Sequence, residues 1–87
     1  MHKVVYSKGA IKDVEKIKKS GLKDKTLRLI EVVKSNPYQN PPPYEKLLGE
    51  LKGLYTRRIN IQHRLVYQIY EKEKVVKILS MWTHYEW

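Results

Sequence analysis

The sequence contains no cysteine, few acidic residues and no long apolar run. Without cysteine there is no disulfide framework and no thiolate metal site, which fits a reducing cytosol. Because neither a signal peptide nor a membrane-length apolar stretch is present, we expect a cytoplasmic protein that does not enter membranes. There is no Gly-rich phosphate loop, and His2, His63 and His84 lack the spacing of metal ligands. We therefore expect no metal and no other cofactor.

Acidic residues are outnumbered by basic ones. The 87 residues include 18 Lys and Arg but only 9 Asp and Glu, which gives a formal net charge of +9. A chain of this length predicts one domain, spanning residues 1–87, with a modest core. Its basic excess indicates a polyanionic partner, such as nucleic acid, a ribosome or an acidic protein. The alternative is that the Lys excess serves solubility alone.

The first half of the chain predicts a short strand and two helices. The strand is Lys3–Tyr6, and Ser7 is a candidate N-cap for the helix that follows. Ser20 and Gly21 end this helix, and Asn36 with Pro37 ends the next one. Apolar residues at helical spacing predict the buried stripes, which are Ala10, Ile11, Val14 and Ile17, then Leu22, Thr26, Leu29, Ile30 and Val33.

The second half predicts a proline-rich loop and three strands. Four prolines between Asn36 and Tyr44 exclude regular structure there. Residues 54–61 and 64–70 are β-branched and aromatic, and a short turn near Gln62-His63 would make them a hairpin. The last strand, Lys74–Trp82, is apolar on both faces and is expected inside the sheet. The fold class is therefore α+β: an N-terminal strand, two antiparallel helices on one sheet face, and a three-strand antiparallel meander.

Alternation along the hairpin separates its two arginine-bearing faces. Tyr55, Ile59 and Ile61 share the apolar face, with Arg57 as the exception. Arg58 and Arg64 share the opposite, open face. Because Arg offers a planar fork of donors and stays charged, this pair suits a phosphate. The alternative is that these arginines are solvated or pair with Glu50 and Glu71.

The open face offers the groups that metal-independent RNA cleavage requires. A base must take the 2′-OH proton, a cation must stabilise the charge of the transition state, and an acid must protonate the leaving 5′-oxygen. Glu45, Arg64 and His84 suit these roles in that order, since His titrates near neutral pH. Tyr85 suits stacking on a base. Strict alternation would put His84 on the face of Val76 and Ile78 and leaves open which face that is.

One block carries a family resemblance. Residues Gly53 to Asn60, GLYTRRIN, followed by His63 to Tyr67, HRLVY, and by His84-Tyr85, resemble the Txe/YoeB toxins of toxin–antitoxin systems. These belong to the RelE/ParE superfamily. The similarity covers nearly the whole chain and is strongest from Tyr44 to Tyr70. It implies a microbial-ribonuclease-like fold and an mRNA endonuclease that acts at the ribosomal A site.

The resemblance also implies residue roles and partners. By position, Glu45 matches the general base, Arg64 the phosphate-stabilising residue and His84 the general acid. Arg57, Arg58 and Tyr85 are the expected substrate-binding residues. The implied partners are the ribosome with its mRNA, a cognate acidic antitoxin and a second copy in a homodimer.

The chain departs from the family pattern at two places, and two other functions remain as alternatives. Family members usually end near the His-Tyr pair, whereas this chain adds Glu86-Trp87, and Pro41–Pro43 replaces a Gly- and Lys-bearing loop before Glu45. One alternative is a toxin of the same fold that blocks the ribosome, or DNA gyrase as in the ParE branch, without cutting RNA. Another is a generic basic RNA-binding domain.

Overall fold

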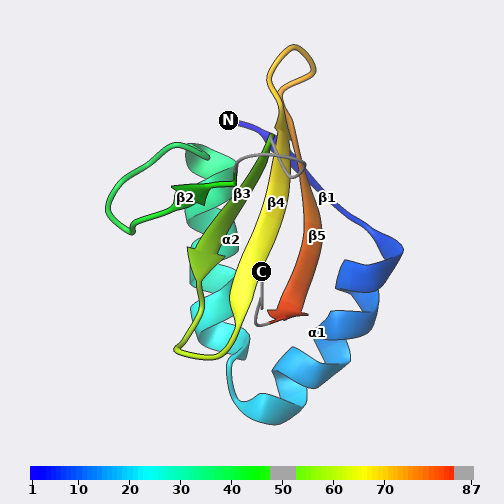
Figure 1. Ribbon diagram of the computed structural model, residues 1–87. Helices are drawn as coiled ribbons and strands as arrows, with labels where there is room; N and C mark the ends of the chain where they lie inside the picture. Colours follow the sequence, from blue (N-terminus) through cyan, green and yellow to red (C-terminus); the bar gives the residue numbers. More distant parts are fainter. Residues whose placement is uncertain (48–52, 84–87) are drawn as a thin grey trace.

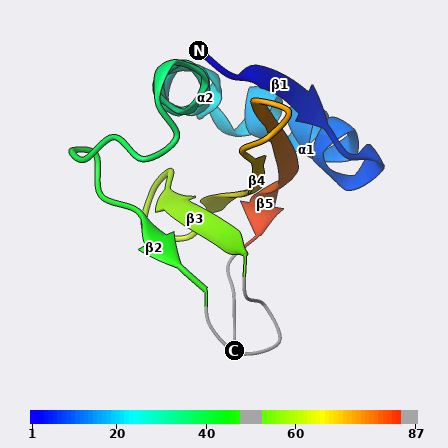
Figure 2. The ribbon, with the colours of Figure 1, turned by 90° about the horizontal axis from the view of Figure 1, so that it is seen from above.

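The computed structural model describes residues 1–47 and 53–83. In chain order, its elements are β1 (Lys3–Tyr6), α1 (Lys8–Ser20), α2 (Lys23–Ser35), β2 (Glu45–Lys46), β3 (Leu54–Arg58), β4 (Arg64–Tyr70) and β5 (Val75–Thr83). The strands form one sheet in the order β1-β5-β4-β3-β2 (Figure 1). Figure 2 shows both helices on the same side of that sheet. The predicted α+β class and the placement of the helices are confirmed.

The helix ends follow from local chemistry. The Ser7 hydroxyl accepts a hydrogen bond from the Ala10 amide at 3.1 Å, as an N-cap does. Gly21 ends α1 with φ of 78°, a left-handed conformation that costs glycine little. Asn36 ends α2 just before Pro37.

The helical stripes are confirmed with one exception. Ala10 and Ile17 of α1 are buried, and so are Thr26, Ile30 and Val33 of α2. Ile11, which was predicted to be buried, is 60% exposed. It lies at the edge of the stripe, where α1 meets water rather than the sheet.

The sheet is mixed, not wholly antiparallel. β1 pairs with β5 in parallel, with Lys3 opposite Val75 and Tyr6 opposite Ile78. The other pairings are antiparallel. β5 is flanked by β1 and β4, which confirms the interior position expected from its two apolar faces. The short strand β2, which the sequence did not predict, extends the other edge by pairing with β3.

The connection between β3 and β4 is longer than predicted. β3 ends at Arg58, and Ile61 is 95% exposed at the tip of the loop rather than on the apolar face. The Asn60 side-chain oxygen accepts hydrogen bonds from the amides of Gln62 and His63, at 2.9 and 2.7 Å. Asn readily forms such a local turn in competition with the strand ladder, so β3 ends early.

An irregularity in β5 changes which of its side chains face the core. Tyr67 lies opposite Ile78, but Val66 lies opposite Ser80, so β5 has an extra residue there. The Asp13 carboxylate on α1 accepts from the amides of Met81 and Trp82, at 3.0 and 3.3 Å. As a result Met81 is buried in the core together with Ile78, which strict alternation would forbid.

The Glu71 carboxylate joins two distant segments, at His2 and Tyr38, to the β4–β5 turn. It accepts from the Tyr38 hydroxyl at 2.6 Å and the Lys74 ammonium at 3.1 Å, and it lies 2.9 Å from the His2 ring. These contacts, that of Tyr38 first, lower the pKa of Glu71 from 4.5 to about 2. The alternative in which Glu71 pairs with an open-face arginine is wrong, because the partners of Glu71 among the described residues are Tyr38, Lys74 and His2. Glu50 lies outside the described residues.

The depressed pKa of Glu71 predicts an acid-dependent loss of stability. Ionised Glu71 stabilises the fold above its unfolded pKa of 4.5, and that contribution disappears as pH falls toward 2. Wild type should therefore melt at a higher temperature than Glu71→Gln at pH 7, and the gap should close as pH falls to about 2. Melting followed by circular dichroism at both pH values measures this. The control is Glu73→Gln in the same turn, which should match wild type; a pH-independent gap for Glu71→Gln would contradict the prediction.

Candidate functional site

Strand pairing brings distant polar residues together on the open sheet face. Glu45 of β2 lies opposite Thr56 of β3, and two residues further along β3, Arg58 lies opposite Arg64 of β4. Residues opposite each other, or two apart, on one face of a sheet are close neighbours. The predicted sharing of a face by Arg58 and Arg64 is confirmed, and Glu45 joins them from the edge strand.

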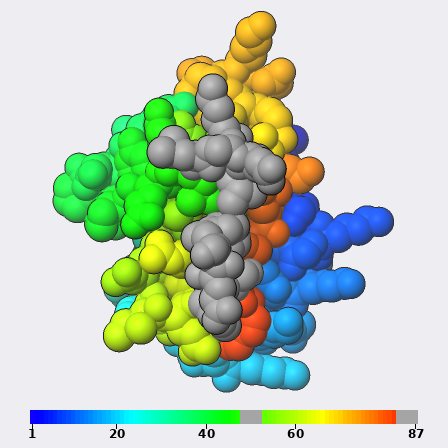
Figure 3. Space-filling view, viewed as in Figure 1, coloured from blue at the N-terminus to red at the C-terminus, as the bar shows by residue number. Residues whose placement is uncertain are grey.

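A pocket of about 260 Å³ lies among these residues, lined by Pro43, Tyr44, Glu45, Thr56, Arg58 and Arg64. The space-filling view shows the loop and β2 (green) and the end of the hairpin (yellow-green) on this face (Figure 3). Glu45 and Arg64 contact each other loosely, with 4.0 Å between Oε1 and Nη1. The Glu45 side chain is 70% exposed and that of Arg64 only 27%. An exposed carboxylate thus stands at the mouth, above a half-buried cation.

The Glu45–Arg64 ion pair is long and therefore weak, so a bound anion can replace it at Arg64. An exposed ion pair at this distance is weak, so a phosphate that offers two oxygens competes with it easily. Arg58 is exposed, and no ion pair involves it within residues 1–47 and 53–83. The pocket therefore combines one carboxylate with two guanidiniums that are free to bind a phosphate.

Thr56 is a pocket residue that the sequence did not single out. Its side chain is buried, and within residues 1–47 and 53–83 its hydroxyl oxygen has no hydrogen-bond partner. A buried hydroxyl without a partner is costly, which marks Thr56 as a candidate ligand contact at the pocket floor. The signal in the sequence was its place in the strand, on the face of Arg58, but a strand threonine alone is too common to indicate a site.

Arg57 lies on the opposite face and does not reach the pocket. It is 1% exposed, and its Nη atoms donate to the carbonyls of Pro37, Gln39 and Pro42, at 2.6 to 3.0 Å. Its Nε donates to the Tyr67 hydroxyl at 2.9 Å. The expectation that Arg57 binds substrate is therefore wrong in this structure, because its donors are taken up within the protein.

Arg57 instead holds the proline-rich loop against the core. Its guanidinium lies 4.9 Å from the ring centre of Tyr44, the residue before Glu45. Tyr67 completes the cluster by donating to the Pro37 carbonyl at 3.2 Å, and burial raises the pKa of its hydroxyl, which keeps it neutral. Because the loop leads directly into β2, fixing the loop also fixes where Glu45 begins to pair with β3.

The predicted acid and its neighbour fall outside the described residues. His84 and Tyr85 follow Thr83, which is the last described position and pairs with Arg64. The alternation used to place His84 does not hold along β5, because the register shifts twice relative to β4. The described part of β5 therefore ends opposite Arg64.

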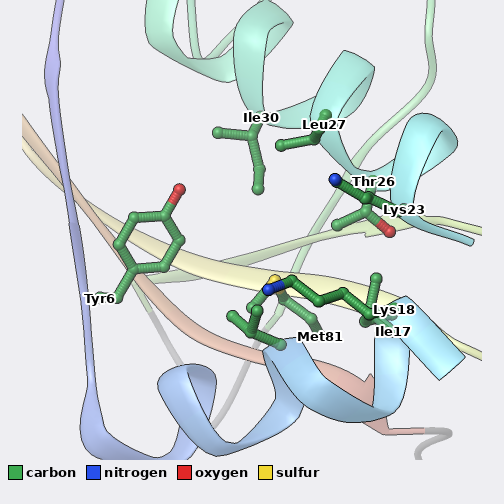
Figure 4. Close-up of a pocket in the computed structure, with 9 residues that line it drawn as sticks. Tyr6, Ile17, Lys18, Lys23, Thr26, Leu27, Ile30 and Met81 are labelled. Carbon is green, nitrogen blue, oxygen red and sulfur yellow. The ribbon is translucent and has the colours of Figure 1, made fainter.

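A second hollow in the molecule has a different character. It measures about 220 Å³ and is lined mainly by apolar side chains of α1, α2, β1 and β5, among them Tyr6, Ile17, Leu27 and Ile30 (Figure 4). Only Lys18, Lys23, Thr26 and the Tyr6 hydroxyl bring polar atoms to it. It offers no acid–base pair, so it is not the candidate active site.

In the described part of the chain, no group of three or more His, Asp or Glu residues is placed to hold a metal ion. The described helices include none that is long and apolar enough to span a bilayer.

The contrast between two adjacent arginines predicts a stability difference. In Arg57→Lys a single ammonium replaces the guanidinium and cannot reach all three loop carbonyls. Some of these buried carbonyls therefore lose their hydrogen-bond donors. We expect the free energy of unfolding to fall by about 3 kcal/mol. The matched variant Arg58→Lys, on the exposed face, should stay within about 0.5 kcal/mol of wild type. Urea denaturation measures both, and equal losses would mean that the loop does not depend on the Arg57 fork.

Known proteins resemble this chain over most of its length. The family model described as YoeB-like toxin of bacterial type II toxin-antitoxin system matches residues 5–85. Toxin YoeB of Mycobacterium bovis is 40% identical over 58 residues, which is 67% of this chain and 66% of that protein. Toxin YoeB of Synechocystis is 36% identical over a segment covering 65% of its length. The aligned segment thus spans slightly less than two thirds of these curated relatives.

Solved structures agree with the sequence relationship. A structure described as YoeB/ParE toxin from Agrobacterium tumefaciens superposes with a TM-score of 0.86 at 26% identity, covering 95% of this chain and 99% of that one. The YoeB-YefM complex from Staphylococcus aureus contains a chain with a TM-score of 0.80 at 30% identity, covering 98% and 99%. From the family match along residues 5–85 and these neighbours, the chain belongs to the YoeB-like toxins of bacterial type II toxin–antitoxin systems.

Proposed function

We propose that this chain is an endoribonuclease that cleaves mRNA at the ribosomal A site and so inhibits translation. The observation that carries the proposal is the pocket in which Glu45 and Arg64 face each other at 4.0 Å, with Arg58 on the same wall. A carboxylate beside two guanidiniums is the arrangement that a phosphodiester with a neighbouring hydroxyl requires. Membership of the YoeB-like toxin family supports the same activity.

The proposed reaction is a transesterification within the RNA. Glu45 accepts the proton of the 2′-hydroxyl, whose oxygen attacks the adjacent phosphorus. Arg64 and Arg58 stabilise the negative charge that builds up on the phosphate oxygens. The bond to the 5′-oxygen breaks as His84 donates a proton to that oxygen. The products are a 2′,3′-cyclic phosphate and a free 5′-hydroxyl, so atoms and protons balance, and no metal enters the scheme.

The partners follow from charge and from relatives. A net charge of +9 supports binding to the ribosome, whose RNA is a polyanion, and this target would place the chain in the cytoplasm. The staphylococcal relative is described in complex with YefM, and a YoeB dimer is described from the same organism. We infer that this chain also binds an acidic antitoxin, and that it also forms a homodimer.

The first test is mRNA cleavage in a purified translation system, with cuts mapped by primer extension. Wild type should produce discrete cuts at A-site codons. Glu45→Gln keeps the shape of the side chain but cannot act as a base, so its cleavage rate should fall by about 10²- to 10⁴-fold. Glu73→Gln, an exposed acid in the β4–β5 turn, is the matched control and should cut normally. Arrested translation without any cuts would favour the blocking alternative, and unchanged cuts in Glu45→Gln would place the base elsewhere.

The second test separates chemistry from partner binding in cells. Arg64→Ala and His84→Gln should each abolish growth inhibition, because losing a group that stabilises or protonates the transition state costs about 10²- to 10³-fold in rate. Both variants should still co-purify with the antitoxin. Lys72→Ala, in the β4–β5 turn, should remain toxic. Full toxicity of both site variants would rule out their catalytic roles.

A further inference from the structure

Arg58 lines two further pockets besides the candidate active site. One of about 220 Å³ lies against α2, and one of about 610 Å³ lies beside the β3–β4 loop. Arg58 and Ile59 line both, and so does Lys25 of α2. Since Arg58 also lines the Glu45 pocket, the three hollows follow one another across the surface. We call the two new pockets together the α2 groove.

Two of the three cations of the α2 groove, Lys25 and Arg28, come from one face of α2, and the third is Arg58 of β3. Lys25, Arg28, Leu29 and Val32 line the groove, at the spacing i, i+3, i+4 and i+7 that aligns side chains on a helix. The acidic residues of α2, Asp24 and Glu31, are not among its lining residues, and no carboxylate is. In the part of the chain that the structure describes, Lys25, Arg28 and Arg58 take part in no ion pair. The groove therefore gathers three cations that form no ion pair with a carboxylate of residues 1–47 or 53–83.

Most of the remaining lining of the groove is apolar, with Asn60 as the polar exception. Leu29, Val32, Pro42 and Ile59 line the part against α2, and Ile61 stands at its edge. A nucleotide has the same mixed character, since its phosphate is charged while its base and ribose present flat, less polar surfaces. Cations that track a backbone beside apolar surface are what single-stranded RNA sites use.

We propose that the α2 groove is a second phosphate subsite, which binds an RNA backbone phosphate next to the nucleotides held in the Glu45 pocket. Arg58 stands between the two sites and contacts the chain on both sides, while Lys25 and Arg28 bind the neighbouring phosphate. This proposal rests on the nuclease function proposed above. It adds α2, through two named cations, to the surface that holds the substrate complex.

Continuity favours RNA over an acidic peptide as the occupant. A strand of RNA that places one phosphate at Arg64 must carry its next phosphates across the adjoining surface, and the adjoining surface on the Arg58 side is this groove. The guanidiniums of Arg28 and Arg58 also match phosphate by their forked geometry. The phosphate belongs either to the mRNA itself or to ribosomal RNA, and both sources share this chemistry.

The test compares two double variants that remove the same charge. Lys25→Gln/Arg28→Gln removes the groove cations, and Lys12→Gln/Lys16→Gln removes two exposed lysines of α1. Both are made in the full chain with Glu45→Gln, so that bound RNA stays intact. Binding to a short single-stranded RNA is measured by fluorescence anisotropy over a range of salt concentrations. The groove variant should bind about tenfold more weakly, with a salt slope lower by about 1.4, whereas the α1 variant should change little.

Ribosome sedimentation then identifies the source of the phosphate. Programmed ribosomes are prepared with an mRNA that extends beyond the A-site codon or with one that ends at it. A loss of groove-variant binding only with the extended mRNA assigns the phosphate to mRNA; an equal loss with both assigns it to ribosomal RNA. Both outcomes support the subsite, and Lys25→Arg/Arg28→Lys, which keeps both charges, should bind within about threefold of the parent.

Two results would overturn the subsite. The first is an equal loss in the groove and α1 variants, which would reduce the effect to net charge, or no loss in either, which would mean that Lys25 and Arg28 do not bind RNA. The second is unchanged RNA and ribosome binding together with lost antitoxin binding, which would make the groove a protein-binding surface. Melting curves confirm that each variant is folded. Because these readouts are binding, they remain valid if wild type proves not to cleave mRNA, so failure of the nuclease proposal is seen separately.

Discussion

A buried guanidinium holds the wall of the candidate site in place. Arg57 enters the core without a carboxylate partner among the described residues and donates to three loop carbonyls and the Tyr67 hydroxyl. A charge in this position is tolerated only if nearly all its donors are paired, so the loop and the guanidinium depend on each other. A proline-rich loop suits this role, because prolines have no amide to satisfy and their carbonyls remain free to accept.

Adjacent arginines have opposite tasks because a strand turns alternate side chains to opposite faces. Arg57 points to the core and shapes the loop, whereas Arg58 points to the open face and meets Arg64. Arg57, which holds the loop beside the pocket, and Arg58, which lines the pocket, are thus adjacent in the sequence. A shift of β3 by one residue would turn Arg57 to the open face and away from the loop carbonyls that now accept its hydrogen bonds.

The charges of the Glu45 pocket and of the α2 groove suit an incoming polyanion better than they suit the folded protein alone. Arg64 has only a loose contact with Glu45, and Arg58 and the groove cations have no carboxylate partner among the described residues. Clustered like charges raise the free energy of the folded chain, and a bound phosphate backbone relieves that repulsion. The same property explains how an acidic antitoxin would compete for the surface. Glu45 contributes little electrostatic stabilisation, which is consistent with a group kept for chemistry rather than for folding.

The sequence by itself determined the local features. The Ser7 and Gly21 caps, most of the helical stripes, and the shared face of Arg58 and Arg64 follow from residue type and spacing, and the GLYTRRIN and HRLVY block indicated the family. Only the tertiary structure decided the parallel partner of β1, the shifted register of β5 and the contact of Glu45 with Arg64. It also revealed Thr56 at the pocket floor and turned Arg57 from an expected ligand contact into a core anchor. The physical reason is range: caps and periodicity depend on neighbours a few residues apart, whereas these features depend on contacts between segments that meet only when the chain is folded.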